Sequence, residues 1–485
     1  MPGIARPAWN DTAWIAFAVL TVACSQPPDG NKREPAPLSI APCAIAGLEG
    51  RCGSLAVPEN RTTRSGRTID LKIVVLPARS RTAASDPIFI LVGGPGQAAT
   101  SLASPGGFDP ALNESRDLVF VDQRGTGDSN PLDCELPGNP SDPQSYLGDV
   151  FQVPVFEKCR DELAPKADVT QYTTAAAADD LDDVRAALGY TRINLMGGSY
   201  GTRAALIYMR RHPASVRTAV LNGVAPASLK NPLYHARAAQ EALDGVFDEC
   251  AGDRACNAAF PRLREEFHAV IERLEKEPVR VSTTAETGTP ATVTLGRYAF
   301  AETIRTMMYR VDGSRQVPLL VHQAFRGDFL PLVQRAIQQR RGNSRLAHGM
   351  LLTTTCAEDV ARIGDNEIST TTAGTFLGAD RVTHQREVCA IWPKGHVDDE
   401  DAAPVRSDAP VLLLSGTQDP VTRPAWAEDA LHTLPNGRHI LVPGAHGVGG
   451  MCIRQIVRDF LNGGSAKDLD TSCTQDIRLP PFVTR

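Results

Sequence analysis

The chain has 485 residues, 42% of them hydrophobic and 22% charged, and its formal net charge is −6. Because one ordinary hydrophobic core rarely absorbs so long a chain, the length predicts two domains or one domain with a large insertion. The weakly acidic balance argues against nucleic acid as a partner, and no run of Lys and Arg indicates binding to an anionic membrane surface.

The first residues of the chain predict export. Ala13–Ala23 (AWIAFAVLTVA) is uncharged and mostly apolar, and Arg6 precedes it. Spanning a bilayer takes roughly 20 apolar residues, so this run is too short for a membrane helix but suits a signal peptide. A buried apolar segment or a misassigned start codon is the alternative. We expect a signal peptide over residues 1–24.

Cys24 offers a candidate lipid attachment site. Thr21-Val22-Ala23-Cys24 resembles the lipobox of bacterial lipoproteins, although the usual Leu lies one place early, at Leu20. In such proteins the cysteine is lipidated and becomes the new N-terminus, and Ser25 would be compatible with outer-membrane sorting. The alternative is ordinary cleavage near Ala23, which would give a secreted protein. Membrane contact is therefore expected only through Cys24, in a periplasmic, outer-membrane or secreted bacterial protein.

The remaining cysteines also favour export. The chain has 11, and those after Cys24 are even in number and fall as close pairs in the sequence. Because disulfides form in oxidising compartments, an even number of cysteines favours an exported protein with disulfides. Their close spacing favours pairing between neighbours, and reduced thiols in a cytosolic enzyme are the alternative. The expected bridges are Cys43–Cys52, Cys134–Cys159, Cys250–Cys256, Cys356–Cys389 and Cys452–Cys473.

The expected elements begin after a linker. Residues 25–42 are predicted to be disordered, because Gln26–Pro37 (QPPDGNKREPAP) is rich in proline and polar residues. Two strands are expected next, over Gly53–Val57 and Thr68–Leu76. Continuous apolar runs then predict strands covered on both faces, in a mainly parallel sheet with flanking helices. These runs are Pro87–Val92, Asp117–Val121, Arg192–Met196, Thr218–Leu221, Pro410–Leu414 and His439–Val442.

Helices are expected between these strands. In Asp179–Leu188 (DDLDDVRAAL) the acids crowd the first predicted turns, where carboxylates suit the helix dipole. Residues 226–409 are too many for a loop and include a helical pattern over Arg262–Glu277. We predict that they form a helical cap, inserted between the two parts of the core at residues 43–225 and 410–485.

Gly197-Gly198-Ser199-Tyr200-Gly201 is the sharpest chemical signal. It follows an apolar run and opens a helical segment, Thr202–Arg211. A G-x-S-x-G motif between strand and helix is a nucleophile elbow, whose glycines are needed because the turn is strained and crowded. Ser199 is therefore the predicted nucleophile.

A serine hydroxyl needs an oriented base, and in elbow-containing hydrolases the acid and the histidine follow the serine in that order. Asp419 comes directly after the predicted strand Pro410–Leu414, and His446 after the strand His439–Val442. His446 would take the Ser199 proton and return it to the leaving group, while Asp419 would hold the imidazole tautomer. His212, His432 and His439 are less well placed, at a helix end, within a helix and at a strand start.

Gly93-Gly94-Pro95-Gly96 follows the predicted strand Pro87–Val92. Such a turn can aim a backbone N–H at the oxyanion that develops during acyl transfer. We expect the oxyanion hole to consist of the N–H groups of Gly94 and Tyr200. Taken alone, the sequence GGPG indicates only a tight turn.

These motifs, together with Val121-Asp122-Gln123-Arg124-Gly125-Thr126-Gly127 and Ser129, resemble the prolyl iminopeptidase and tripeptidyl aminopeptidase branch of the α/β-hydrolases. The resemblance covers roughly Cys52–Cys473. It implies an α/β-hydrolase fold with a mainly parallel, doubly wound sheet and an inserted, mostly helical cap domain. Asp122 and Arg124 are interpreted as a structural turn. Val92 stands where prolyl iminopeptidases have His before GGPG, which weakens a strict proline-iminopeptidase assignment.

The resemblance also bears on the substrate site. Relatives that cleave from a free amino end bind the ammonium through cap carboxylates, which implies this role for Glu358 and Asp359; Glu302 lies on another predicted cap helix. A solvated acidic helix start is the alternative for the pair. No HExxH, GxGxxG or P-loop motif is present, so neither metal nor cofactor is expected.

The predicted function is that of an exported serine aminopeptidase releasing aminoacyl, prolyl or tripeptidyl units through an acyl-enzyme. An esterase or amide hydrolase would use the same scaffold, since the triad does not choose the substrate. A lipoprotein that uses the scaffold only for binding is a third hypothesis. The expected partner is a peptide or a small ester or amide.

Overall fold

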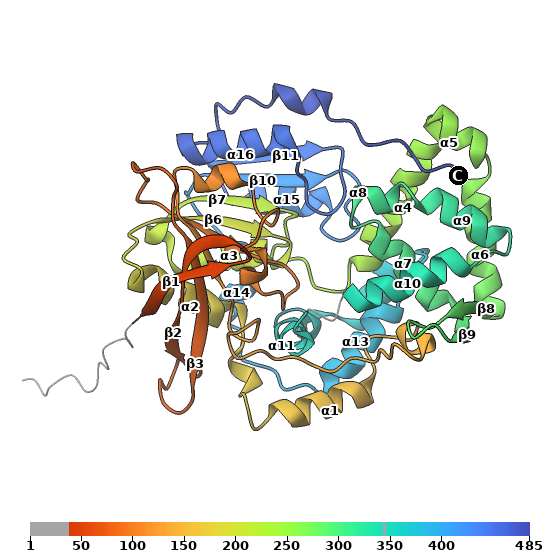
Figure 1. The fold of residues 1–485 in the computed structure, drawn as a ribbon, viewed down its shortest axis with the longest axis horizontal. Helices are drawn as coiled ribbons and strands as arrows, with labels where there is room; N and C mark the ends of the chain where they lie inside the picture. Colours follow the sequence, from red (N-terminus) through yellow and green to blue (C-terminus); the bar gives the residue numbers. More distant parts are fainter. Residues whose placement is uncertain (1–37, 343–345) are drawn as a thin grey trace, which may run out of the picture. The chain divides into compact units, whose positions relative to one another are not determined.

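The structure, a computed structural model, describes residues 38–342 and 346–485 (Figure 1). The predicted signal peptide over residues 1–24, Cys24 and the first part of the predicted linker lie outside the described residues. Within those two ranges, no helix combines the length and the apolar character that crossing a membrane requires.

A nine-stranded sheet forms the core, in the order β1-β2-β3-β5-β4-β6-β7-β10-β11. From β5 to β11 in this order each strand is parallel to the next, whereas the pairs β1–β2, β2–β3 and β3–β5 are antiparallel. Their bounds are β1 Ser39–Ile45, β2 Leu48–Pro58, β3 Thr68–Leu76, β4 Ile88–Leu91, β5 Leu118–Val121, β6 Ile193–Gly198, β7 Val216–Asn222, β10 Val411–Gly416 and β11 Gly437–Val442. Every predicted strand is present, and the mainly parallel sheet is confirmed.

Burial on both faces explains why these apolar runs become strands. In β5, Val119 packs into one hydrophobic cluster while Leu118 and Phe120 pack into another, on the opposite face of the sheet. Each fully buried side chain of this kind contributes about 1.5–3 kcal/mol relative to exposure. One cluster contains α1 (Val153–Leu163), α2 (Thr174–Ala187), α3 (Tyr200–Arg211) and α15 (Pro424–Leu431), and the other contains α16 (Met451–Gly463).

Two local expectations were wrong. The linker predicted over residues 25–42 extends too far, because Ser39–Ile45 pairs with β2 as an edge strand, which local composition does not reveal. Helix α2 starts at Thr174, so its acids do not occupy the first turn and the dipole does not explain them. Instead Asp180 accepts two hydrogen bonds from the fully buried Arg124, at 2.6 and 2.7 Å.

Residues 226–409, here called the cap segment, lie between β7 and β10 and are mostly helical. The helices are α4 His235–Gly252, α5 Arg254–Ala259, α6 Leu263–Lys276, α7 Arg297–Met307, α8 Val311–Ser314, α9 Val317–Phe325, α10 Leu330–Gly342, α11 His348–Glu358, α12 Asp365–Thr372, α13 Asp380–Ile391 and α14 Asp399–Ala402. An antiparallel hairpin, β8 (Val279–Thr284) and β9 (Pro290–Leu295), interrupts them.

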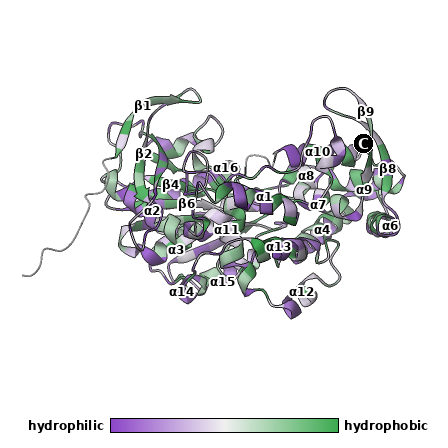
Figure 2. Ribbon diagram, turned by 90° about the horizontal axis from the view of Figure 1, so that it is seen from below, coloured by the Kyte–Doolittle hydropathy of each residue, from purple (hydrophilic) through white to green (hydrophobic). Residues whose placement is uncertain are grey.

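The cap segment has two kinds of packing. Helices α4, α5, α6, α7, α9 and α10 contribute to a second hydrophobic cluster, which includes Phe267 and Phe300, whereas α11 and α13 pack into the main core. The helices in Figure 2 carry both apolar (green) and polar (purple) residues, as expected for helices that bury one face. The segment is therefore attached to the sheet through α11 and α13.

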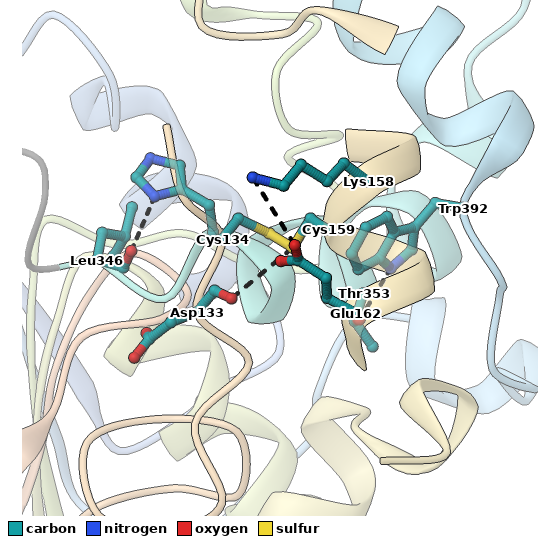
Figure 3. The surroundings of a disulfide bond; sticks show 9 residues. Asp133, Cys134, Lys158, Cys159, Glu162, Leu346, Thr353 and Trp392 are labelled. Carbon is teal, nitrogen blue, oxygen red and sulfur yellow. Dashed lines mark hydrogen bonds and ion pairs between the residues drawn. A yellow bond between two sulfur atoms is a disulfide. The ribbon is translucent and has the colours of Figure 1, made fainter. Parts of the chain in front are cut away.

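All five predicted disulfides are present: Cys43–Cys52, Cys134–Cys159, Cys250–Cys256, Cys356–Cys389 and Cys452–Cys473. Figure 3 shows the second of these, which joins the segment after β5 to α1. Next to it the Trp392 indole N–H donates to Thr353 Oγ1 at 2.9 Å. Cys356–Cys389 joins α11 to α13, so a covalent bond reinforces the attachment of the cap segment.

Candidate active site

Ser199 occupies a strained turn between β6 and α3. Its backbone has φ +55° and ψ −125°, a conformation that costs an L-residue of order 1–3 kcal/mol. The flanking glycines permit the turn, because a Cβ at Gly197 would lie 2.5 Å from Gly201 O and one at Gly201 would lie 2.2 Å from Leu91 O. The sequence folds locally into the elbow that the motif predicts.

Asp419 and His446 meet beside this turn. Asp419 follows β10, its side chain is fully buried, and Oδ2 lies 2.9 Å from His446 Nδ1. The backbone N–H groups of Val421 and Thr422 donate to Oδ1 at 2.9 and 2.8 Å. Thr422 Oγ1 also donates to the carboxylate, at 2.8 Å. Both oxygens of Asp419 are thus engaged, which fixes its orientation toward the imidazole.

A short bridge connects the Ser199 turn to the His446 loop. The Ser199 N–H donates to Asn222 O at 3.0 Å. The Asn222 side chain donates to Val448 O at 2.8 Å and accepts from Val448 N at 2.9 Å. A Cβ at the next residue, Gly223, would lie 3.4 Å from His446 Cε1. Ser199 and His446 therefore flank the same two residues at the end of β7.

The glycine-rich turn lies against the serine. A Cβ at Gly93 would stand 3.0 Å from Ser199 Cβ. The Gly93 N–H already donates to the Gln97 side chain at 3.2 Å, and Pro95 has no N–H. Tyr200 is the first residue of α3, where a backbone N–H has no partner in a preceding helical turn. Gly93 and Tyr200 therefore adjoin Ser199, and the oxyanion hole of Gly94 and Tyr200 stays a prediction.

Asp122 binds the segment that directly follows the glycine-rich turn. Its carboxylate accepts from the backbone N–H and the hydroxyl of Thr100, at 2.8 and 2.9 Å, and from Asp128 N at 3.2 Å. Thr100 lies in the short helix that follows the glycine-rich turn, Ala99–Leu102. Burial raises the pKa of Asp122, while these hydrogen bonds oppose the shift. Asp122 thus positions a loop, as the sequence suggested.

Glu358 and Asp359 are bound within the fold. Asp359 is buried against Arg203 of α3, with both carboxylate oxygens 2.8 Å from Nη1. Glu358 accepts from Thr174 N and Oγ1, at 2.6 and 2.7 Å, and burial raises its pKa to about 7. These contacts connect α11 to α2 and α3 rather than to the Ser199 turn. The sequence could not show this, because the partners are far away along the chain.

The cap segment contributes Tyr309 and Arg305, which sequence reasoning missed. The Tyr309 ring meets the His446 imidazole edge-on, with centroids 5.1 Å apart. Arg305 Nη1 donates to the Tyr309 hydroxyl at 2.8 Å, and Nη2 donates to Glu302 at 2.7 Å. No local motif marks these residues, because only the tertiary fold brings α7 to His446.

Charges set the protonation of His446. Burial opposes the imidazolium, but the Asp419 carboxylate outweighs this effect and raises the pKa of His446 above its ordinary value. The Arg305 guanidinium acts in the opposite direction and lowers that pKa. His235, at the start of α4, is fully buried, and burial keeps its pKa far below the ordinary histidine value. His446 is therefore the histidine here suited to accept a proton.

The sequence of this chain is similar to those of known hydrolases and peptidases. A family model described as alpha/beta hydrolase fold matches residues 86–259, and one described as TAP-like protein matches residues 375–473. The serine protease Hip1 of Mycobacterium tuberculosis is 25% identical over 521 residues, which covers 97% of this chain and 98% of that protein. The tripeptidyl aminopeptidase of Streptomyces coelicolor is 24% identical over 459 residues, covering 87% and 83%. A probable proline iminopeptidase of the same organism is 34% identical over 145 residues, covering 29% and 34%.

Proposed function

We propose that the chain, which matches an alpha/beta hydrolase fold over residues 86–259 and a TAP-like protein over residues 375–473, is a serine peptidase that removes short N-terminal units from peptides. The observation that carries the proposal is the 2.9 Å contact between Asp419 and His446 Nδ1, beside a serine held on a strained elbow. The similarity to a serine protease and to a tripeptidyl aminopeptidase along most of the chain supports peptides as the substrate class.

The proposed reaction proceeds in two steps. His446 Nε2 removes the Ser199 proton as Oγ attacks the scissile carbonyl, and the N–H groups of Gly94 and Tyr200 stabilise the oxyanion. His446 then gives the proton to the leaving amine, which departs and leaves an acyl-enzyme. Water, deprotonated by His446, attacks the ester and releases the acid. Asp419 holds the imidazole tautomer throughout and stabilises the imidazolium.

We also propose that the protein acts outside the cytoplasm. Five disulfides favour an oxidising compartment, because thiols in the cytosol are kept reduced. The predicted signal peptide supports the same conclusion, and Cys24 is the candidate site for a lipid anchor. Metabolic labelling with a clickable fatty acid, compared between wild type and Cys24→Ala, tests the anchor.

Active-site labelling tests the mechanism. A fluorophosphonate probe is expected to label the wild type and not the Ser199→Ala variant, whose hydrolysis falls by at least about a thousandfold. A wild-type enzyme inert to the probe would leave only a binding function on this scaffold.

Paired substrates test the specificity. Tripeptidyl arylamides with a free amino end should be hydrolysed faster than the same compounds after N-acetylation. Hydrolysis restricted to blocked substrates or simple esters would replace the aminopeptidase proposal with an esterase or amide hydrolase.

A further inference from the structure

Two arginines of the cap segment form no contact ion pair among the described residues. Arg381 of α13 stacks on the Phe151 ring, with its guanidinium carbon 4.4 Å from the centroid. Its Nε is buried without a hydrogen-bond partner, and none of its nitrogens forms an ion pair within residues 38–342 and 346–485. Arg340 of α10 donates through Nη2 to Gly148 O, but its Nη1 is buried and unpartnered. No carboxylate in the described part of the chain lies within ion-pair distance of Arg340.

The carboxylates in this neighbourhood already bind other donors. Asp149 accepts from the Tyr298 hydroxyl at 2.8 Å and pairs with His384. Glu302 pairs with Arg305, although its Oε1 is buried without a partner. Burial lowers the pKa of Arg340 and Arg381 lowers it further, while Tyr298, Asp149 and Glu302 oppose the shift. These acids act on Arg340 without an ion-pair contact, so buried guanidinium nitrogens of Arg340 and Arg381 still lack a hydrogen-bond acceptor.

One face of α7 connects these arginines to the active site. Tyr298, Glu302 and Arg305 of α7 follow at helical spacing, and Tyr309 continues the row two residues beyond the end of the helix. Tyr309 contacts His446 at one end of the row. At the other end Arg381 acts electrostatically on both Tyr298 and Glu302. The row is about 16 Å long at 1.5 Å per residue, comparable to a short extended peptide. Figure 1 shows α7 and α10 side by side in this part of the cap segment.

We infer that Arg340 and Arg381 form an anion subsite that accepts a carboxylate side chain, Asp or Glu, in the N-terminal segment of the peptide substrate. The planar guanidinium group matches a carboxylate in two parallel hydrogen bonds, and the unpartnered nitrogens supply the donors. The inference rests on the proposed function, because a released N-terminal unit is the part of the substrate that would lie under the cap segment.

Matched substrates test the subsite. Tripeptidyl arylamides with a free amino end carry Glu or Gln at one of the three positions, so each pair differs only in charge. The wild type is expected to show a kcat/KM about tenfold or more higher for Glu than for Gln at one position, as a charge-assisted pair warrants. In Arg381→Met and Arg340→Met this ratio should fall toward one. Arg310→Met is the matched control and should keep the ratio, since the Arg310 side chain is 81% exposed.

The outcomes separate the two proposals. Equal rates for Glu and Gln in the wild type at every position overturn the subsite while leaving the peptidase intact. If no arylamide is hydrolysed, the peptidase proposal is wrong. The rates for Glu and Gln are then compared with aryl esters of the same peptides. Esters that are inert or show no preference overturn the subsite as well. Fluorophosphonate labelling of Ser199 verifies that each variant is folded. A preference for Glu that stays unchanged in both labelled variants also overturns the assignment of the subsite to Arg340 and Arg381.

Discussion

Buried charged groups at the ends of the core strands have hydrogen-bond partners, whereas some buried charged groups of the cap segment do not. At the strand ends, Asp419 has a partner for each oxygen, and the fully buried Arg124 donates to Asp180 and to backbone carbonyls. In the cap segment, Arg340, Arg381 and Glu302 keep buried atoms without partners. A catalytic base must be oriented before the substrate arrives, whereas a recognition surface gains affinity by completing hydrogen bonds with the substrate itself.

This difference separates the groups proposed for catalysis from those proposed for substrate selection. In the proposed mechanism, preorganised groups at the ends of the strands supply the chemistry, and that chemistry is common to many hydrolases. In the proposed subsite, the incompletely paired arginines of the cap segment select among substrates. Arg305 and Tyr309 form one contact between the two regions, because Arg305 donates to the Tyr309 hydroxyl and the Tyr309 ring meets His446.

Asp419→Asn should have the largest effect, and it tests whether the fully paired carboxylate at the strand ends orients His446. The amide cannot hold the same imidazole tautomer, so kcat is expected to fall by about 10³- to 10⁴-fold. Steady-state hydrolysis of a tripeptidyl arylamide measures this loss. Asp468→Asn alters an exposed carboxylate and serves as the control. A fall of less than tenfold in Asp419→Asn would show that another group orients His446.

Asp359→Asn tests whether the buried pair that attaches α11 is needed for stability. The change leaves the buried Arg203 charge without its partner, so the free energy of unfolding should fall by about 3–5 kcal/mol. Urea titration gives this value. The exposed pair of Arg264 and Asp248 provides the contrast, and Asp248→Asn should cost no more than about 1 kcal/mol. Equal losses in the two variants would contradict a special role for the buried pair.

Glu358→Gln tests how burial of a carboxyl group makes the stability of the protein depend on pH. Burial raises the folded-state pKa of Glu358 from 4.5 to about 7, so between these values the folded protein binds more protons than the unfolded chain. Wild-type stability therefore contains a contribution that is lost as pH rises through this window. The variant lacks it and should become more stable relative to wild type from pH 5 to pH 7, by at most about 1.4 kcal/mol per pH unit.

Urea titrations of both proteins at several pH values measure that difference. Glu265→Gln, at an exposed position, should show no such trend. A difference between wild type and Glu358→Gln that is independent of pH would mean that Glu358 titrates normally.

Arg305→Met should have the smallest effect and tests the contact between the two regions. Arg305 lowers the pKa of His446, so its removal should raise that pKa. The acid limb of kcat/KM, which reports the free base, should then move to higher pH by less than about one unit. In the wild type the Asp419 carboxylate places this limb above the ordinary histidine value. Arg310→Met is the control and should leave the acid limb of kcat/KM in place. If the limb does not shift in Arg305→Met either, Arg305 does not influence the pKa of His446.

Local patterns in the sequence predicted most strands of the sheet, the elbow and the disulfides. Apolar runs such as the one in Asp117–Val121 favour strands buried on both faces, and the Gly197–Gly201 motif permits a turn that larger residues would block. The cysteines after Cys24 pair with their neighbours in the sequence. The edge strand β1 and the hairpin β8–β9 escaped prediction, since their stability depends on partners rather than on their own composition.

The order of Ser199, Asp419 and His446 along the chain, each at the end of an apolar run, was determined by the sequence alone. Tertiary structure decided how the acids of the cap segment are used: Glu358 and Asp359 are bound to α2 and α3, while Glu302 belongs to the row that reaches His446. The physical reason is that strand formation depends on neighbouring residues, whereas the environment of a charge depends on residues that only the folded chain brings close.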